Sequence, residues 1–337
     1  MFQRHLVIAT LMVACCCAHA ATPELSADRV NFYSAPVAGL PSQAVGSKKL
    51  KIVEAALPLS VSEAARVRAQ LVNYGMDTGK AGMLADAMTH GYYLTMLGSL
   101  SNVFDGARPK SICLALTVKA EALSFGIFEP EKPPELDSAL LAFIAVHEKA
   151  HCLNRYERQD MASIDGAVNE NVEWRNEATA DIAAFAEMRR HGRAGYAAAQ
   201  AWRTKRWFGF LSGDLSHWTI PLVNMVESAR AGEMPDVAQA YRAIGGDQAF
   251  EQIRSGWDAL LSALFAGEDG GKAQADAWNR AVEVFPSRVR SAIPSIDDTR
   301  RMAQAVWPGS ADWRLRAIDR KKAPKGVVLE GAPRVAR

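Results

Sequence analysis

Beyond its first 20 residues the sequence has no long hydrophobic run, no strong excess of one charge, no internal repeat and no low-complexity tract. No later segment approaches the 18 uncharged apolar residues of a membrane-spanning helix. The 39 lysines and arginines nearly balance 37 acidic residues, for a net charge of +2, so the charge does not indicate nucleic-acid binding. We therefore expect a mature chain without a transmembrane segment or a nucleic-acid partner, and long enough for a sizeable core.

Residues 1–20 have the pattern of a secretory signal peptide. Arg4 supplies positive charge, residues 6–17 are apolar, and the Ala-His-Ala sequence at 18–20 is typical of a signal peptidase site. We predict cleavage after Ala20 and a secreted or periplasmic protein.

A lipoprotein signal is the weaker alternative. Cys15 would then be the lipidated residue, but Met12 stands where such signals usually have Leu. Cysteine is scarce in the chain, and removal of the signal peptide takes away three of the five cysteines. Only Cys113 and Cys152 remain.

Histidine is rare too, with seven residues, yet two of them stand in the pattern H-E-x-x-H. On a helix, residues four apart share a face, so His147 and His151 can aim both imidazoles at one metal ion. Glu148 is rotated by about 100° and flanks the metal, where it can take a proton from an activated water. We expect a helix here, with Asp137 or Ser138 as its N-cap.

A third ligand is expected on a second helix, over residues 171–190. Glu177 can complete a His2Glu site, and Asp181, one turn later, can accept the free ring N–H of a ligand histidine. Glu170 and Glu173 are rival ligands, but we expect them on a solvated helical face.

These two motifs, H-E-x-x-H and the later N-E-A-x-x-D at 176–181, resemble those of the gluzincin metallopeptidases, the thermolysin-like clan. The resemblance covers about 45 residues. It implies a zincin-like fold in which His147, His151 and Glu177 hold Zn²⁺ and Glu148 acts as the general base.

The longer metzincin motif is absent. A metzincin would have Gly and a third His further along the chain, where this sequence has Asn154 and Glu157. The metzincin class is therefore excluded.

Cys113 and Cys152 form either one disulfide or two buried thiols, and the sequence leaves both open. Because Cys152 directly follows His151, a bridge would brace the metal helix against the preceding strand. Cys152 is a poor candidate for a metal ligand, since it points about 100° away from His151.

Gluzincins generally supply a His or Tyr from the C-terminal lobe to stabilise the oxyanion of the reaction. His217, oriented by Asp214, is the best candidate in sequence order, and a structural loop histidine is the alternative. Aromatic residues near it either wall a substrate cleft or belong to the core: Trp202, Trp207, Phe208, Phe210 and Trp218.

The expected fold is α+β and mostly α-helical, zincin-like, with a small N-terminal sheet, the H-E-x-x-H helix and an all-helical C-terminal lobe. Residues 21–310 would form one catalytic domain, with a mixed lobe to about residue 155. Residues 21–49 would be an extended lead-in or a prosegment, and residues 311–337 a basic tail.

Local signals place several elements. Apolar runs predict strands at 50–57, 111–118 and 123–129, and in zincins an edge strand such as one of the last two pairs with the substrate. Capping boxes predict helices that begin after Ser60 and Ser295. Another helix is expected over residues 80–100. A further helix is expected to begin with Asp247 as its N-cap, because the residues after it form one apolar face at helical spacing: Phe250, Ile253, Trp257, Leu260, Leu261 and Leu264.

The sequence thus predicts a secreted or periplasmic zinc metallopeptidase acting on peptides or proteins. The alternative is a non-catalytic zinc-binding envelope protein whose metal is structural or binds a partner. The basic tail could make weak contact with an anionic envelope surface.

Overall fold

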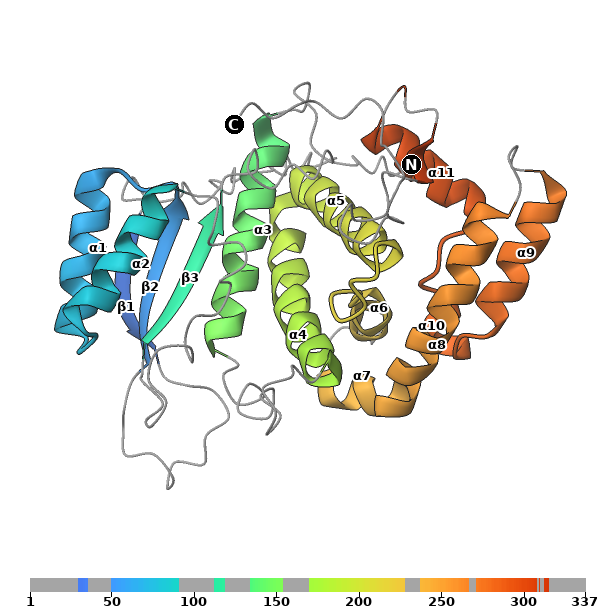
Figure 1. Ribbon diagram of the computed structural model, residues 1–337, viewed down its shortest axis with the longest axis horizontal. Coiled ribbons are helices and arrows are strands. Elements are labelled where there is room, and N and C mark those ends of the chain that lie inside the picture. The colour runs from blue at the N-terminus through green and yellow to red at the C-terminus, as the bar shows by residue number, and fades with distance from the viewer. Residues whose placement is uncertain are drawn as a thin grey trace, which may run out of the picture.

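A small sheet with helices on both faces occupies one side of the molecule, and a larger helical region occupies the other (Figure 1). The chain is therefore α+β and mostly helical, as predicted. The computed structural model describes residues 30–35, 50–90, 112–118, 134–153, 170–227, 237–266, 271–307, 309 and 312–314.

The elements on the sheet side are β1 (Val30–Ala35), β2 (Leu50–Leu57), α1 (Val61–Asn73), α2 (Thr78–His90) and β3 (Ile112–Val118). The central helices are α3 (Pro134–Leu153), α4 (Glu170–Met188), the short 3-10 helix η4 (Arg189–His191), α5 (Gly192–Leu211) and α6 (Ile220–Glu227). The remaining helices are α7 (Val237–Ile244), α8 (Gly246–Phe265), α9 (Lys272–Glu283), α10 (Ser287–Arg290) and α11 (Ile296–Val306).

The sheet has the order β1-β2-β3, with β1 antiparallel and β3 parallel to β2. Its two faces follow the alternation of side chains along each strand. Val53 and Leu114 pair and face the apolar core under α1 and α2, whereas Ile52 and Cys113 pair and face α3. The sheet thus lies between the α1–α2 pair and α3, as Figure 1 shows.

Two predicted strands, 50–57 and 111–118, are confirmed as β2 and β3 within a residue. β1 is a strand that the sequence analysis did not predict, because it lies within the Pro-, Ala- and Gly-rich segment 21–49. Val30 is buried and Phe32 packs beside it, so the alternation at these positions was the available signal. The predicted strand at 123–129 lies outside the described residues.

The helix starts are confirmed where a side-chain cap defines them. Ser60 and Glu63 form the predicted capping box of α1, and the Ser295 hydroxyl accepts from the backbone N–H of Asp298 at the start of α11. The second predicted helix, 80–100, is α2, which begins at Thr78; its part after His90 lies outside the described residues.

Two predicted caps are wrong. α3 begins at Pro134, so Asp137 and Ser138 lie inside the helix. Proline is compatible with the first helical turn, because backbone N–H groups there have no acceptor within the helix and the N–H that proline lacks is not needed. In α8 the N-cap is Gly245, and Asp247 lies in the first turn, where its carboxylate accepts from Tyr241.

The predicted apolar face of α8 packs into one continuous core that joins α3 to α11. α4 was predicted at 171–190 and covers Glu170–Met188. Gly192 follows the short η4 and has a φ of 55°, a positive value that is typical of glycine at a helix end. In the described residues no helix is long and apolar enough to cross a membrane. The predicted signal peptide with Cys15, and the tail beyond residue 314, lie outside the described residues.

Candidate metal centre

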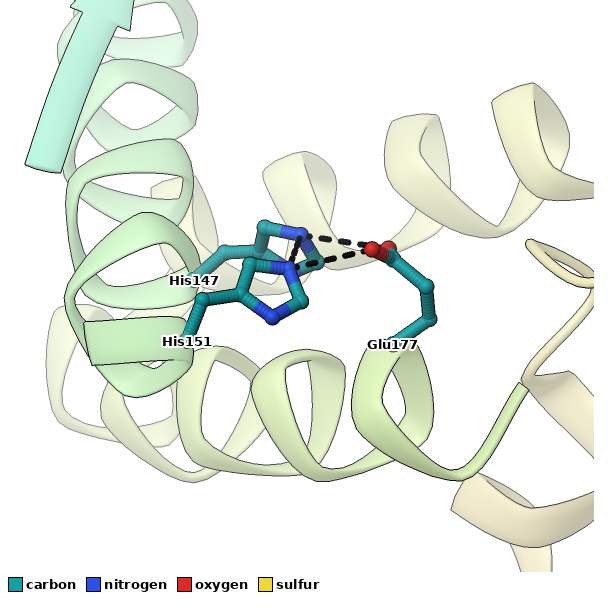
Figure 2. A group of neighbouring side chains, drawn as sticks. All are labelled: His147, His151 and Glu177. Atoms are coloured by element: carbon teal, nitrogen blue, oxygen red, sulfur yellow. Dashed lines mark hydrogen bonds and ion pairs between the residues drawn. The ribbon is translucent and has the colours of Figure 1, made fainter. Parts of the chain in front are cut away.

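The structure brings together the three residues that the motifs single out as ligands: His147 and His151 from α3, and Glu177 from α4 (Figure 2). The apolar stripe of α3 explains how the histidines reach this place. Leu140 and Ile144 are buried in the helical core, and the histidines continue the same stripe at helical spacing. All three ligand side chains are buried and face one another.

The distances between the donor atoms fit a tetrahedral zinc ion. His147 Nε2 and His151 Nε2 are 3.0 Å apart, and the Glu177 carboxylate lies 3.4 Å from the first and 3.1 Å from the second. Zinc bonds of about 2.0–2.1 Å in tetrahedral geometry place neighbouring ligand atoms roughly 3.3 Å apart. Two imidazoles and one carboxylate also form the donor set that zinc takes at catalytic sites.

Asp181 lies behind His147, one helical turn after Glu177. Its Oδ1 is 2.8 Å from His147 Nδ1, within ion-pair distance, although the angles are not those of a regular hydrogen bond. A carboxylate at this nitrogen holds the proton there and leaves Nε2 free for a metal. This is the position predicted for Asp181.

The charges around the three residues favour a cation. Burial alone lowers the pKa of His147, but hydrogen bonds to Asp181 and Glu177 outweigh it and raise this pKa to about 9. Burial raises the pKa of Glu177, yet the charges of His217 and His151 hold it well below its usual range. Glu177 is therefore ionised at neutral pH, and a metal ion would replace the proton on His147.

Arg206, from α5, compensates the buried carboxylates. Its Nε donates to Asp181 at 2.8 Å, and its Nη2 donates to Asp181 at 2.9 Å and to Glu177 at 2.8 Å. Trp202 Nε1, at 2.8 Å, and the Thr219 hydroxyl also donate to Asp181. Burial raises the pKa of Asp181, but Arg206 and His147 hold it below its usual range, so this carboxylate is a fixed anion.

Glu148 is partly exposed on α3, next to the first ligand and outside the metal-ligand group. Among the residues that the structure describes, none forms a hydrogen bond or ion pair with its carboxylate. A partly exposed carboxylate beside a metal position can exchange protons with a bound water. The H-E-x-x-H motif predicts the general base at this residue.

His217 reaches the same centre from the segment between α5 and α6. Its Nδ1 is 2.7 Å from Asp214, as the sequence analysis expected, and its Nε2 is 3.5 Å from Glu177. Burial lowers the pKa of His217, but the charge of Glu177 and the hydrogen bond to Asp214 raise it overall. A protonated His217 can donate to an oxyanion near the metal position.

Glu170 and Glu173, the alternative candidates for the third ligand, are not part of the metal-ligand group. Glu170 pairs with Arg254 near the surface. Glu173 is partly buried beside Ser216 and His217, and burial raises its pKa; the metal-ligand group does not include it. The expectation of a solvated face is therefore wrong for Glu173, because the segment around His217 folds over it.

Cys113 of β3 and Cys152 of α3 form a disulfide, with Cα atoms 5.7 Å apart. The bridge ties the sheet to α3 directly after His151. Its sulfur atoms are therefore not available as metal ligands. Both cysteines are buried between the sheet and α3 with Ile52 and Ala115.

Sequence reasoning missed three residues at the centre: Lys205 and Arg206 on α5, and Thr219 after it. Trp202 was named only as a cleft-wall or core residue, and its hydrogen bond to Asp181 was not predicted. The available signal was the sequence W-R-T-K-R-W-F at 202–208, which places cations within an aromatic stretch. Such a stretch packs into a core, so some of its charges must be buried and need partners. The aromatic residues there do belong to the helical core.

Comparison of the chain with models of known protein families, with curated proteins and with solved structures finds no match. The assignment of function therefore depends on the residues of this chain alone.

Proposed function

We propose that the protein is a zinc-dependent metallopeptidase of the gluzincin type, with a zincin-like fold. The observation that carries the proposal is the convergence of His147, His151 and Glu177, with Asp181 behind the first histidine and Glu148 beside it. An enclosed ligand set of three protein donors leaves a fourth position for water or substrate, which is typical of catalytic zinc.

Each residue has a role in peptide hydrolysis. When bound, Zn²⁺ polarises the substrate carbonyl and makes water a nucleophile at neutral pH. Glu148 takes a proton from the attacking water and delivers it to the leaving amine. His217, held by Asp214, donates a hydrogen bond to the oxyanion that forms on the carbonyl oxygen.

The sheet supports the same proposal. β3 is an edge strand of the described sheet and packs against α3. In this proposal an extended peptide pairs with β3 and passes the metal centre. The Cys113–Cys152 disulfide supports a secreted or periplasmic location, because such bonds persist in oxidising compartments.

The alternative function is a zinc site that serves stability or partner binding without catalysis. A purely structural site is usually closed by four protein ligands. Here the group comprises three, and Glu148 stands beside it with no structural partner among the described residues.

The test is Glu148→Gln, assayed on casein or a mixed peptide library with zinc measured in the same preparation. Gln keeps the size of the side chain but cannot accept the proton, so turnover should fall about 10²–10⁴-fold while zinc stays bound. Glu251→Gln, an exposed site on α8, is the matched control. His217→Ala should lose about 10²–10³-fold, also with zinc retained. A Glu148→Gln protein that keeps its zinc and the wild-type rate would contradict the proposal.

A further inference from the structure

A cation at the metal centre has no assigned role in the proposed reaction. Lys205 lies on α5, directly before Arg206, and its ammonium group is close enough to interact with the charges of Glu148, Asp181 and Glu177. Arg206 uses its donors on Asp181 and Glu177. Lys205, in contrast, has no hydrogen bond or ion pair within the part of the chain that the structure describes.

The indole of Trp202 holds the Lys205 side chain in place. The Lys205 ammonium lies 4.2 Å from the centre of this ring, and the Arg206 guanidinium lies 4.9 Å from it. Trp202 is itself fixed, because its N–H donates to Asp181 and its ring lies 5.5 Å from the ring of His147. The position of Lys205 is therefore coupled to the metal centre.

A cation without a partner among the described residues is costly at this partly buried position. Burial lowers the pKa of Lys205 to about 8, and the charge of Arg206 acts in the same direction. A cation–π contact offsets only part of such a cost. An anionic group of a ligand would supply the missing partner, and charge-assisted hydrogen bonds of this kind are among the stronger ones in proteins.

We infer that Lys205 is a substrate-binding residue that recognises a carboxylate of the peptide. The inference rests on the proposed function, because the anionic groups of a peptide are its C-terminal carboxylate and its Asp and Glu side chains. Glu148 would repel such a carboxylate, and the charge of Lys205 offsets that repulsion. Lys205 therefore gives the enzyme a preference among peptides, while Arg206 serves the metal ligands.

The test compares peptide pairs that differ in one charge. One pair has a free C-terminal carboxylate or a C-terminal amide, and the other has Glu or Gln next to the cleaved bond. For the pair that carries the recognised group, wild-type kcat/KM should be about 10- to 100-fold higher for the acid. Lys205→Met should lower kcat/KM for the acid to the value for the amide. It should leave kcat/KM for the amide within about threefold of the wild-type value. Lys205→Arg should restore part of the preference.

The matched control is Lys51→Met, because Lys51 also places its ammonium over an aromatic ring, 4.9 Å from the centre of Tyr74, but on the sheet. This variant should keep the wild-type preference, and zinc content should be the same in all variants. Wild-type protein that cuts both members of each pair equally would overturn the inference and leave the peptidase function standing. So would an equal loss on acid and amide in Lys205→Met, which would mark Lys205 as a positioning residue for Glu148.

A binding experiment separates this inference from the peptidase function. Zinc-loaded Glu148→Gln protein is titrated calorimetrically with an N-acetylated peptide acid and with its amide, with and without Lys205→Met. Acid-selective binding that depends on Lys205 supports the inference even if no peptide is cut. Equal affinity for acid and amide in the Lys205-containing protein would overturn it.

Discussion

α4 and α8 have almost the same length, 19 and 20 residues, but they bury different chemistry. The buried face of α8 consists of apolar and small side chains such as Phe250 and Leu264. α4 also buries Asn176, Glu177 and Asp181, whose desolvation has to be compensated.

The difference shows what each helix contributes. The buried face of α8 stabilises the helical region by removing apolar surface from water. The carboxylates of α4 are buried at a cost that Arg206 and the two histidines offset, and buried ion pairs of this kind add little net stability. In the proposed function the buried polar groups of α4 hold a metal ion, whereas the buried face of α8 serves packing.

The largest expected effect on stability is on the α8 side of this comparison. Leu264→Ala removes a fully buried side chain from the helical core and should lower the free energy of unfolding by about 2–5 kcal/mol. Zinc affinity of the folded protein should not change. Leu261→Ala, at a partly buried position of the same helix, should cost less. Urea unfolding with parallel zinc titration measures both, and a large loss of zinc affinity in folded Leu264→Ala protein would contradict the separation.

On the α4 side, the expected effect is on the metal. Asp181→Ala removes the carboxylate behind His147 and should weaken zinc binding about 10–100-fold, as changes around a ligand typically do. Competition with a chromophoric chelator measures this affinity. Unchanged affinity in Asp181→Ala would mean that the contact with His147 does not orient the ligand.

A smaller effect follows from the raised pKa of His147. A metal ion must displace the proton from this histidine below pH about 9, so zinc affinity should rise with pH, by at most about tenfold between pH 7 and 8. The stability of the protein without zinc should depend on pH in the opposite direction, because protonated His147 stabilises the folded state. The contribution of protonated His147 is complete below its ordinary pKa of 6.5 and is lost as the pH rises through about 9. Calorimetry in buffers of different ionisation enthalpy counts the released protons, and zinc binding without proton release at pH 7 would contradict this pKa.

Local patterns predicted those parts of the fold that local interactions determine. The Ser60 capping box, strand β2 and the apolar face of α8 each depend on residues within one or two turns or a single strand. β1 was not predicted because the composition of segment 21–49 hides the short alternation at Val30 and Phe32, and its pairing with β2 joins residues about 20 positions apart. The start of α3 was predicted too late, because a good capping residue is only a local signal and Pro134 also fits the first turn of a helix.

The candidate site divides in the same way. His147, Glu148 and His151 follow from spacing on one helix, and Glu177 with Asp181 follow from spacing on another. Thr219 donates to Asp181 across 38 positions in the chain, and Arg206 does so across 25. The sequence pattern of α5 does not indicate which of its cations will face α4. Arg206 and Thr219 could therefore be identified as partners of Asp181 only from the three-dimensional structure.

We propose above all that α3 and α4 together hold one zinc ion. The most direct measurement is the zinc content of purified mature protein, by mass spectrometry of the metal after dialysis, for wild type and for single alanine variants. The account predicts about one zinc per chain in wild type and in Glu173→Ala, and little zinc in His147→Ala, His151→Ala or Glu177→Ala. Stoichiometric zinc in a His147→Ala, His151→Ala double variant, or zinc lost from Glu173→Ala but kept by Glu177→Ala, would contradict it.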